Sequence, residues 1–396
     1  MSITADKSLR KAQRLIKKGQ LNEAAILLRE ILDQHPQNIR ALKCYQNLKA
    51  SVEAKNTALS NPPEHQLRGL LNLYNRGQVY ETLAMTKQLL TNFPKSAFLF
   101  NMQGVCNARL GDFEQAISNY RSALNINPTN AEAFNNLGSA QKNIGDIESA
   151  LESYKKALQI QPNYAEAHNN LGTVLSVMGL IELAMRSYEQ ALKIKPDYAD
   201  ALNNVGSIHQ EKGDLQTAIN SFEKVLLINP RHADALNNLG NTQKSNGDLS
   251  GSINSFRKAI SIQPNHAIAH NNLGMVLKDK GDIDGAMVAW KECVRIRPNF
   301  CEPHVSMGSL YMVTGDFEAS VRSFQAALSI EADNIEANFG KGLTLKESGD
   351  WDGALGSYQK VLNVSPDNIE AYISISSVYQ AKGSIDLAIN ALEKAI

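Results

Sequence analysis

Asparagines that recur at a fixed spacing are the residues of this sequence best suited to binding a ligand. Asn136 is followed by another asparagine every 34 residues up to Asn272, and a second asparagine precedes each of them. A carboxamide offers both an N–H donor and a C=O acceptor, so a row of carboxamides can hold the backbone of an extended peptide largely irrespective of its sequence. Asparagine lowers helix propensity inside a helix, so its recurrence there needs a reason. The row consists of Asn101, Asn136, Asn170, Asn204, Asn238 and Asn272, with Asn135, Asn169, Asn203, Asn237 and Asn271 beside it.

The sequence contains no constellation typical of catalysis or of a bound cofactor. It has no GxxxxGK[ST] phosphate loop, since the Gly-Lys-Gly segment at 340–342 lacks the frame and the preceding strand that such a loop needs. The HExxH and GxSxG motifs do not occur either. Cys293, Cys301 and His304 lie near one another, but their spacing matches no usual zinc site. We therefore predict that the chain is not an enzyme and that it holds no cofactor and no metal.

The asparagines belong to a repeated unit, of which residues 131–164 are typical. Apolar residues at spacings of three and four predict two short amphipathic helices in this unit. Gly145 lies between them, where a residue able to adopt positive φ ends the first helix, and Asp146 is placed to cap the second. Pro162 then ends the second helix, because proline has no N–H to continue it. A pair this short cannot bury its apolar face alone, so neighbouring pairs must stack.

This unit resembles the tetratricopeptide repeat family, and its many copies in register make the resemblance specific. The resemblance implies an all-α fold, a right-handed α-solenoid superhelix of about eleven helix pairs with one continuous core. It also implies that the first helix of each pair lines a concave groove, where ligands bind, and that the residue before the Leu-Gly pair faces inward. The positions that carry the resemblance are Leu137, Gly138, Ala150, Tyr154, Ala157 and Pro162.

The period divides the chain into three parts. Residues 1–60 predict a basic N-terminal repeat followed by an extra helix from Ile39, and the Asn-Pro-Pro segment at 61–63 predicts a turn. Residues 61–96 predict a degenerate repeat, which has Leu70 and Thr82 where small residues are expected. Residues 97–396 predict a regular array whose last unit is truncated. Because a solenoid end needs a polar cap, we expect either a fragment or a further domain after Ile396.

The asparagine row resembles the repeat region of O-linked N-acetylglucosamine transferases, and also that of related bacterial repeat proteins. In the transferases, matching asparagines hold substrate peptides, so the resemblance implies the same role for the row in this chain. A second interpretation stays open. Recently duplicated repeats share residues without using them, and the asparagines could cap or bridge neighbouring helices instead.

The row changes character toward the C-terminus, where apolar residues replace the asparagines. We expect these residues to form an apolar patch in the groove, which would mark an interaction site because apolar patches rarely face solvent without one. The alternative is that a following domain or a capping helix covers them. The patch consists of Val305, Met312, Phe339, Leu343 and Ile373, with Met275 and Val313 on the same face.

Charge and composition limit the classes of partner. The 396 residues carry 40 Lys and Arg and 40 Asp and Glu, so no overall field attracts nucleic acid or a membrane surface. Residues 1–60 hold eleven basic and five acidic side chains. This basic end either contacts an anionic partner or is a solvated terminal face. With no apolar segment typical of a signal peptide and only four irregularly spaced cysteines, we predict a cytoplasmic protein.

Together these features predict a protein–protein interaction scaffold that binds an extended peptide or a partner protein in its concave groove. The alternative is the substrate-recruiting N-terminal arm of a larger glycosyltransferase, sulfotransferase or methyltransferase. We expect neither nucleic acid nor a membrane as partner. The resemblance also leaves self-association open, because convex faces and terminal repeats mediate it in this family.

Overall fold

The computed structural model describes residues 3–396, and the side chains of residues 6–49 and 61–396. Every regular element in residues 3–396 is an α-helix, and none of these helices combines the length and the apolar content needed to cross a bilayer. The chain forms two compact units, Met1–Ile194 and Lys195–Ile396. The prediction of an all-α fold of about eleven helix pairs is confirmed, since the described residues form eleven pairs and one additional helix, α3.

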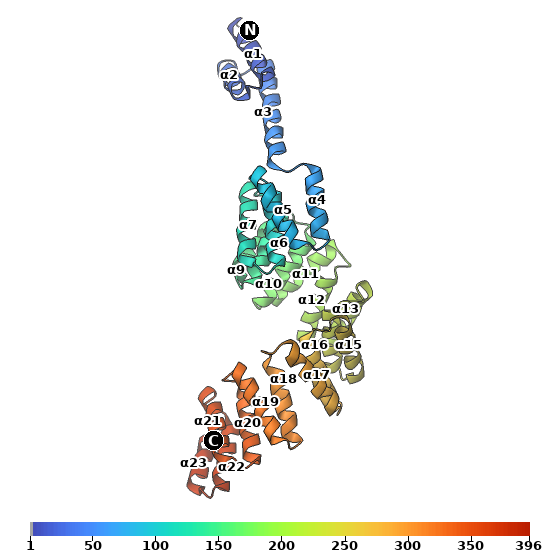
Figure 1. The fold of residues 1–396 in the computed structure, drawn as a ribbon, viewed down its shortest axis with the longest axis vertical. Coiled ribbons are helices and arrows are strands. Elements are labelled where there is room, and N and C mark those ends of the chain that lie inside the picture. The colour runs from blue at the N-terminus through green and yellow to red at the C-terminus, as the bar shows by residue number, and fades with distance from the viewer. Residues whose placement is uncertain (1–2) are drawn as a thin grey trace. The chain divides into compact units, whose positions relative to one another are not determined.

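The helices follow one another in pairs along both units (Figure 1). The first unit contains α1 (Ile3–Lys17), α2 (Leu21–Gln34), α3 (Ile39–Ser60), α4 (Glu64–Asn75), α5 (Val79–Asn92), α6 (Ala97–Arg109), α7 (Phe113–Ile126), α8 (Ala131–Asn143), α9 (Ile147–Ile160), α10 (Ala165–Val177) and α11 (Ile181–Ile194). The second unit contains α12 (Ala199–Glu211), α13 (Leu215–Ile228), α14 (Ala233–Ser245), α15 (Leu249–Ile262), α16 (Ala267–Asp279), α17 (Ile283–Ile296), α18 (Cys301–Val313), α19 (Phe317–Ile330), α20 (Ile335–Glu347), α21 (Trp351–Val364), α22 (Ile369–Ala381) and α23 (Ile385–Ala395).

The turn inside each pair depends on a glycine, as predicted for Gly145. This residue has a φ of +83°, a left-handed conformation that costs little only for glycine. Asp146 follows, and its Oδ1 accepts a hydrogen bond from the backbone N–H of Ser149 at 3.1 Å. This bond satisfies one of the donors that the start of α9 would otherwise leave unpaired. The turn thus fixes where α8 ends and where α9 begins.

Close packing within the pairs from α6–α7 to α20–α21 depends on a second glycine. A Cβ added at Gly138 would lie 2.8 Å from Cε1 of Tyr154, so the ring packs directly against the backbone of α8. Tyr154 is fully buried, as are Ala150 and Ala157 on the same helix. The predicted contact between small and large residues is therefore present.

The N-terminal helices use the same principles with different residues. Helices α1, α2 and α3 share a core that includes Ala12 and Leu28, both fully buried. After α3, the Oδ1 atom of Asn61 accepts a hydrogen bond from the Ser96 hydroxyl at 2.8 Å, at the start of α6. In the next pair, the large Leu70 is fully buried where other pairs have a small residue. Helices α4 and α5 thus form a further pair, with a large residue at the position where the others have a small one.

Candidate binding surface

Neighbouring repeats are joined by hydrogen bonds from asparagines of the row to the asparagines beside it. In the first unit, Asn170 on α10 donates from Nδ2 to Oδ1 of Asn135 on α8 at 2.9 Å. Asn135 is buried, whereas Asn170 is half-buried. One asparagine therefore orients the other and leaves part of the second carboxamide at the surface.

The same bond recurs in the second unit. Asn238 on α14 donates to Oδ1 of Asn203 on α12 at 3.1 Å, and Asn272 on α16 donates to Oδ1 of Asn237 on α14 at 3.0 Å. Asn204, at the same position of α12, is also half-buried. The asparagines thus bridge neighbouring helices, as the second interpretation of the sequence predicts. This use does not exhaust the carboxamides, because each offers two donors and an acceptor with two lone pairs.

At its start the row is arranged differently. Asn101 and Asn136 line a common cavity of about 810 Å³, which the first helices of three successive pairs, α4, α6 and α8, enclose. Asn101 donates from Nδ2 to Oε1 of Glu132 at 3.4 Å, while its buried Oδ1 has no hydrogen-bond partner among the described residues. Asn101 therefore has a side-chain oxygen beside this cavity that accepts no hydrogen bond from the described residues.

At its other end the row stops for a reason visible in the sequence. Asn271 is buried, and its Oδ1 has no hydrogen-bond partner among the described residues. The donor of each bridge lies 35 residues after its acceptor, and that place is occupied here by Ser306. The shorter serine replaces the carboxamide, so the bridge is lost.

The predicted apolar patch is not a continuous solvent-facing surface. Val305 is only 5% exposed and belongs to a core cluster of α18 to α20, which corrects the expectation that it faces the groove. It stands where other repeats carry a buried asparagine such as Asn237, on the face that contacts the neighbouring repeat. Phe339 and Leu343 pack against the core, and the Phe339 ring lies 5.6 Å from that of Tyr358.

The remaining patch residues reach solvent to different degrees. Met312 is half-buried, and Ile373 is 50% exposed. Met275 and Val313 are exposed as well. An interaction role for these scattered side chains stays a prediction.

Cys293 and Cys301 are buried in the structure, and His304 is half-buried. No group of three or more metal-binding side chains comes together among the described residues. Cys301 is buried, and burial raises the pKa of its thiol to about 11. Burial lowers the pKa of His304. His270, one repeat earlier, has its Nε2 3.0 Å from the carbonyl oxygen of Pro264, which ties the start of α16 to the preceding turn.

Two histidines cap helices and also reach acidic residues of the preceding repeat. Nδ1 of His232 accepts a hydrogen bond from the Ala235 backbone N–H at 3.2 Å, and its Nε2 lies 3.5 Å from Oδ1 of Asp200. His266 repeats the arrangement, with its Nε2 3.2 Å from Oδ1 of Asp234. The hydrogen bond with Asp200 raises the pKa of His232 despite partial burial, and the same bond lowers the pKa of Asp200.

Replacing His232 with asparagine is expected to remove a pH-dependent part of the stability. Because the pKa of folded His232 lies above its ordinary 6.5, its stabilisation is complete below that pH and is lost as pH rises through the raised value. Asn130 and Asn334 cap α8 and α20, so asparagine preserves the cap. Urea unfolding should show a loss of up to about 1 kcal/mol at about pH 5.5 and a smaller loss at about pH 8. Equal losses at both pH values would contradict the linkage.

The two columns of asparagines are visible in the sequence, but the way in which they pair is not. A repeat of 34 residues does not reveal a bond between residues 35 apart, because the extra residue reflects how one helix lies beside the next. The links from His232 and His266 to acidic residues were missed as well. Their signal in the sequence was a histidine at the N-cap position of two successive repeats, each with an aspartate two residues later or in the preceding repeat at the matching place.

Two family models match segments that together cover more than half of the chain. The model described as "TPR repeat" matches residues 108–145, 143–179, 178–213, 244–281 and 342–383. The model described as "Tetratricopeptide repeat" matches residues 199–232, 267–300 and 302–334. A comparison with curated proteins found no match.

Several solved structures are similar to parts of the chain. The crystal structure of MamA is 28% identical over 41% of this chain and 95% of its own, with a TM-score of 0.36. PilF of Pseudomonas aeruginosa is 20% identical over 52% of this chain and 94% of its own, with a TM-score of 0.47. YrrB, described as a TPR protein with an unusual peptide-binding site, is 24% identical over 46% of this chain and 95% of its own, with a TM-score of 0.36.

Proposed function

The chain belongs to the tetratricopeptide repeat family, and from this premise we propose that its asparagine row binds the backbone of an extended peptide. Membership of the family supports a protein-interaction scaffold in general. The finer part of the proposal is the site, namely the half-buried carboxamides on the first helices of successive pairs. The ligand is a segment of a partner protein without a fixed secondary structure of its own.

One observation carries this proposal: the carboxamides are held in place yet keep free hydrogen-bonding capacity. Asn272 uses Nδ2 to reach Asn237, while its Oδ1 accepts no hydrogen bond from the described residues. Oδ1 of Asn238 has only a long contact of 3.4 Å with Nδ2 of Asn237. A peptide N–H could donate to such an oxygen without first ordering the side chain, which reduces the entropic cost of binding.

The proposal predicts sequence-tolerant binding of moderate affinity. A typical hydrogen bond contributes about 1 kcal/mol net to the free energy of binding, so several asparagines of the row must bind the peptide together. Backbone groups are common to all peptides, so the identity of the peptide side chains would contribute little to the affinity at these asparagines. The chain acts in this proposal by binding and not by catalysis. Four free cysteines favour a reducing compartment such as the cytoplasm as its location.

The proposal is tested by comparing two double variants of the second unit. Asn238→Ala with Asn272→Ala removes the half-buried carboxamides. Asn203→Ala with Asn237→Ala removes the acceptors that these two asparagines use, so it breaks the same two bridges. A library of unrelated extended peptides would be passed over each immobilised protein, and the retained peptides would be titrated by calorimetry.

We expect the first double variant to weaken binding by about 2 kcal/mol, roughly 30-fold in Kd. The second should lose comparable stability, because it breaks the same bridges, but much less affinity. If both variants lost affinity equally, the asparagines would serve only to join repeats, and the proposed site would be wrong.

A further inference from the structure

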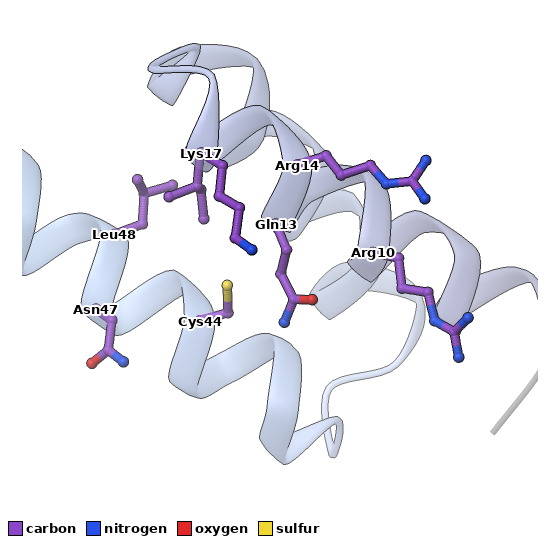
Figure 2. A pocket seen from close by; sticks show the side chains of 8 residues that line it. Arg10, Gln13, Arg14, Lys17, Cys44, Asn47 and Leu48 are labelled. Atoms are coloured by element: carbon purple, nitrogen blue, oxygen red, sulfur yellow. The ribbon is translucent and has the colours of Figure 1, made fainter.

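The N-terminal helices enclose a second cavity, which shares no residue with the asparagine row. It lies between α1 and α3 and has a volume of about 540 Å³. Figure 2 shows that the Lys17 side chain extends from α1 toward the Cys44 sulfur on α3, and that the Gln13 carboxamide points into the same space. The guanidinium groups of Arg10 and Arg14 point away from Cys44. The cavity therefore has one cation directed into it and two at its rim, and all three side chains are exposed to solvent.

The floor of the cavity is apolar. Leu48 of α3 is buried and Ile16 of α1 is half-buried, and both line the cavity together with Cys44. Burial raises the pKa of the Cys44 thiol, so this group stays neutral and adds no charge. An apolar side chain of a ligand would lose contact with water on entering such a space, which favours binding.

Two of the three cations at this cavity have no ion-pair partner among the residues whose side chains the structure describes. None of the described residues that line the cavity carries a carboxylate, and the ion pair of Arg10 with Asp6, at 3.7 Å, is exposed. Neither Arg14 nor Lys17 has an ion-pair partner within the described part of the chain. Residues 1–60 as a whole carry eleven basic and five acidic side chains. The unpaired positive charge around an apolar floor calls for a ligand that is acidic and apolar at once.

We infer that this cavity binds an acidic segment of a partner protein, with an apolar side chain of that segment seated against Ile16 and Leu48. The flanking carboxylates of the segment would then face Lys17, which points into the cavity, and Arg10 and Arg14 at its rim. Nucleic acid supplies the charge but no aliphatic group for the floor, and the flat surface of an anionic bilayer does not match a cavity between two helices. A peptide of mixed acidic and apolar residues supplies both features.

The test uses the full chain and a fluorescein-labelled peptide of repeated Glu-Glu-Leu units, followed by fluorescence anisotropy. Arg14→Glu with Lys17→Glu is expected to raise the Kd about tenfold or more. Lys11→Glu with Lys18→Glu changes the net charge equally but alters residues outside the cavity, so its effect should stay below about threefold. Circular dichroism of both variants would verify that the helices remain folded.

A second readout monitors the cavity directly. Cys44 is half-buried, whereas Cys106, Cys293 and Cys301 are buried, so N-ethylmaleimide should alkylate Cys44 first. Bound peptide should slow this alkylation severalfold. Equal binding of a Lys-Lys-Leu or a Glu-Glu-Ser peptide would overturn the inference, as would equal effects of the two charge variants. Stronger protection of Cys44 by duplex DNA or by anionic phospholipid vesicles would overturn it as well.

Discussion

Replacing Trp290 with alanine is expected to lower the free energy of unfolding of the second unit by about 3–5 kcal/mol. Trp290 is fully buried and is the largest such side chain in the described part of the chain. It packs among Phe256, Val276 and Leu310, which come from three other helices. Truncation would leave a cavity between two neighbouring repeats, and a solenoid can close such a gap only by shifting the repeats themselves.

Trp351→Ala provides the matched control for this variant. Trp351 is 38% exposed at the start of α21, so its loss should cost about 1 kcal/mol. Urea unfolding followed by circular dichroism would measure both variants. Hydrogen exchange would then locate the effect of Trp290→Ala in the helices around α16 and α17. Similar losses for the two tryptophans would mean that Trp290 is not the centre of this core.

The second large effect is expected when Gly274 is replaced with alanine. The added Cβ would lie 2.5 Å from Nε1 of Trp290, a distance that real Cβ atoms essentially never adopt. The tryptophan cannot move away freely because it is fully buried. Overpacking of this kind costs about 1–3 kcal/mol, and it outweighs the gain in helix propensity that alanine brings.

Gly356→Ala is the control, and it should have the opposite sign. Gly356 lies in α21 of the same unit and is exposed, and an added Cβ would meet no atom within 4 Å. Alanine there should raise the free energy of unfolding by about 0.5–1 kcal/mol, because glycine loses more backbone freedom on folding. Thermal unfolding of both variants would measure these two changes in the free energy of unfolding. If Gly274→Ala were also stabilising, the close contact between helix and ring would be wrong.

Most of the fold could be predicted from the sequence because its determinants are local. Gly145 and Asp146 end one helix and start the next through their own backbone conformation and side chain, so neither needs information about distant residues. The slot for a large residue at Tyr154 was equally predictable, because its glycine partner lies a fixed distance away in the same repeat.

The site was less predictable because it depends on how one repeat lies against the next. The period placed Asn170 and Asn135 in adjacent repeats, but the bond between them follows from the packing of α10 beside α8. The prediction that Val305 faces the groove was wrong for the same reason. Its position in the repeat contacts the neighbouring helices, and an apolar residue there enters the core. The cavity between α1 and α3 likewise requires the structure, since its floor combines residues of two helices.

The most direct test of the asparagine row is a titration with backbone-methylated peptides. A peptide retained by the unaltered chain would be resynthesised with alternate backbone nitrogens methylated, which removes N–H donors and keeps the side chains. Binding of the methylated peptide should be at least about tenfold weaker, whereas replacing its side chains with alanine should change the Kd by less than about threefold. Undiminished binding after methylation, with binding lost on side-chain replacement, would contradict recognition of the peptide backbone by the asparagines.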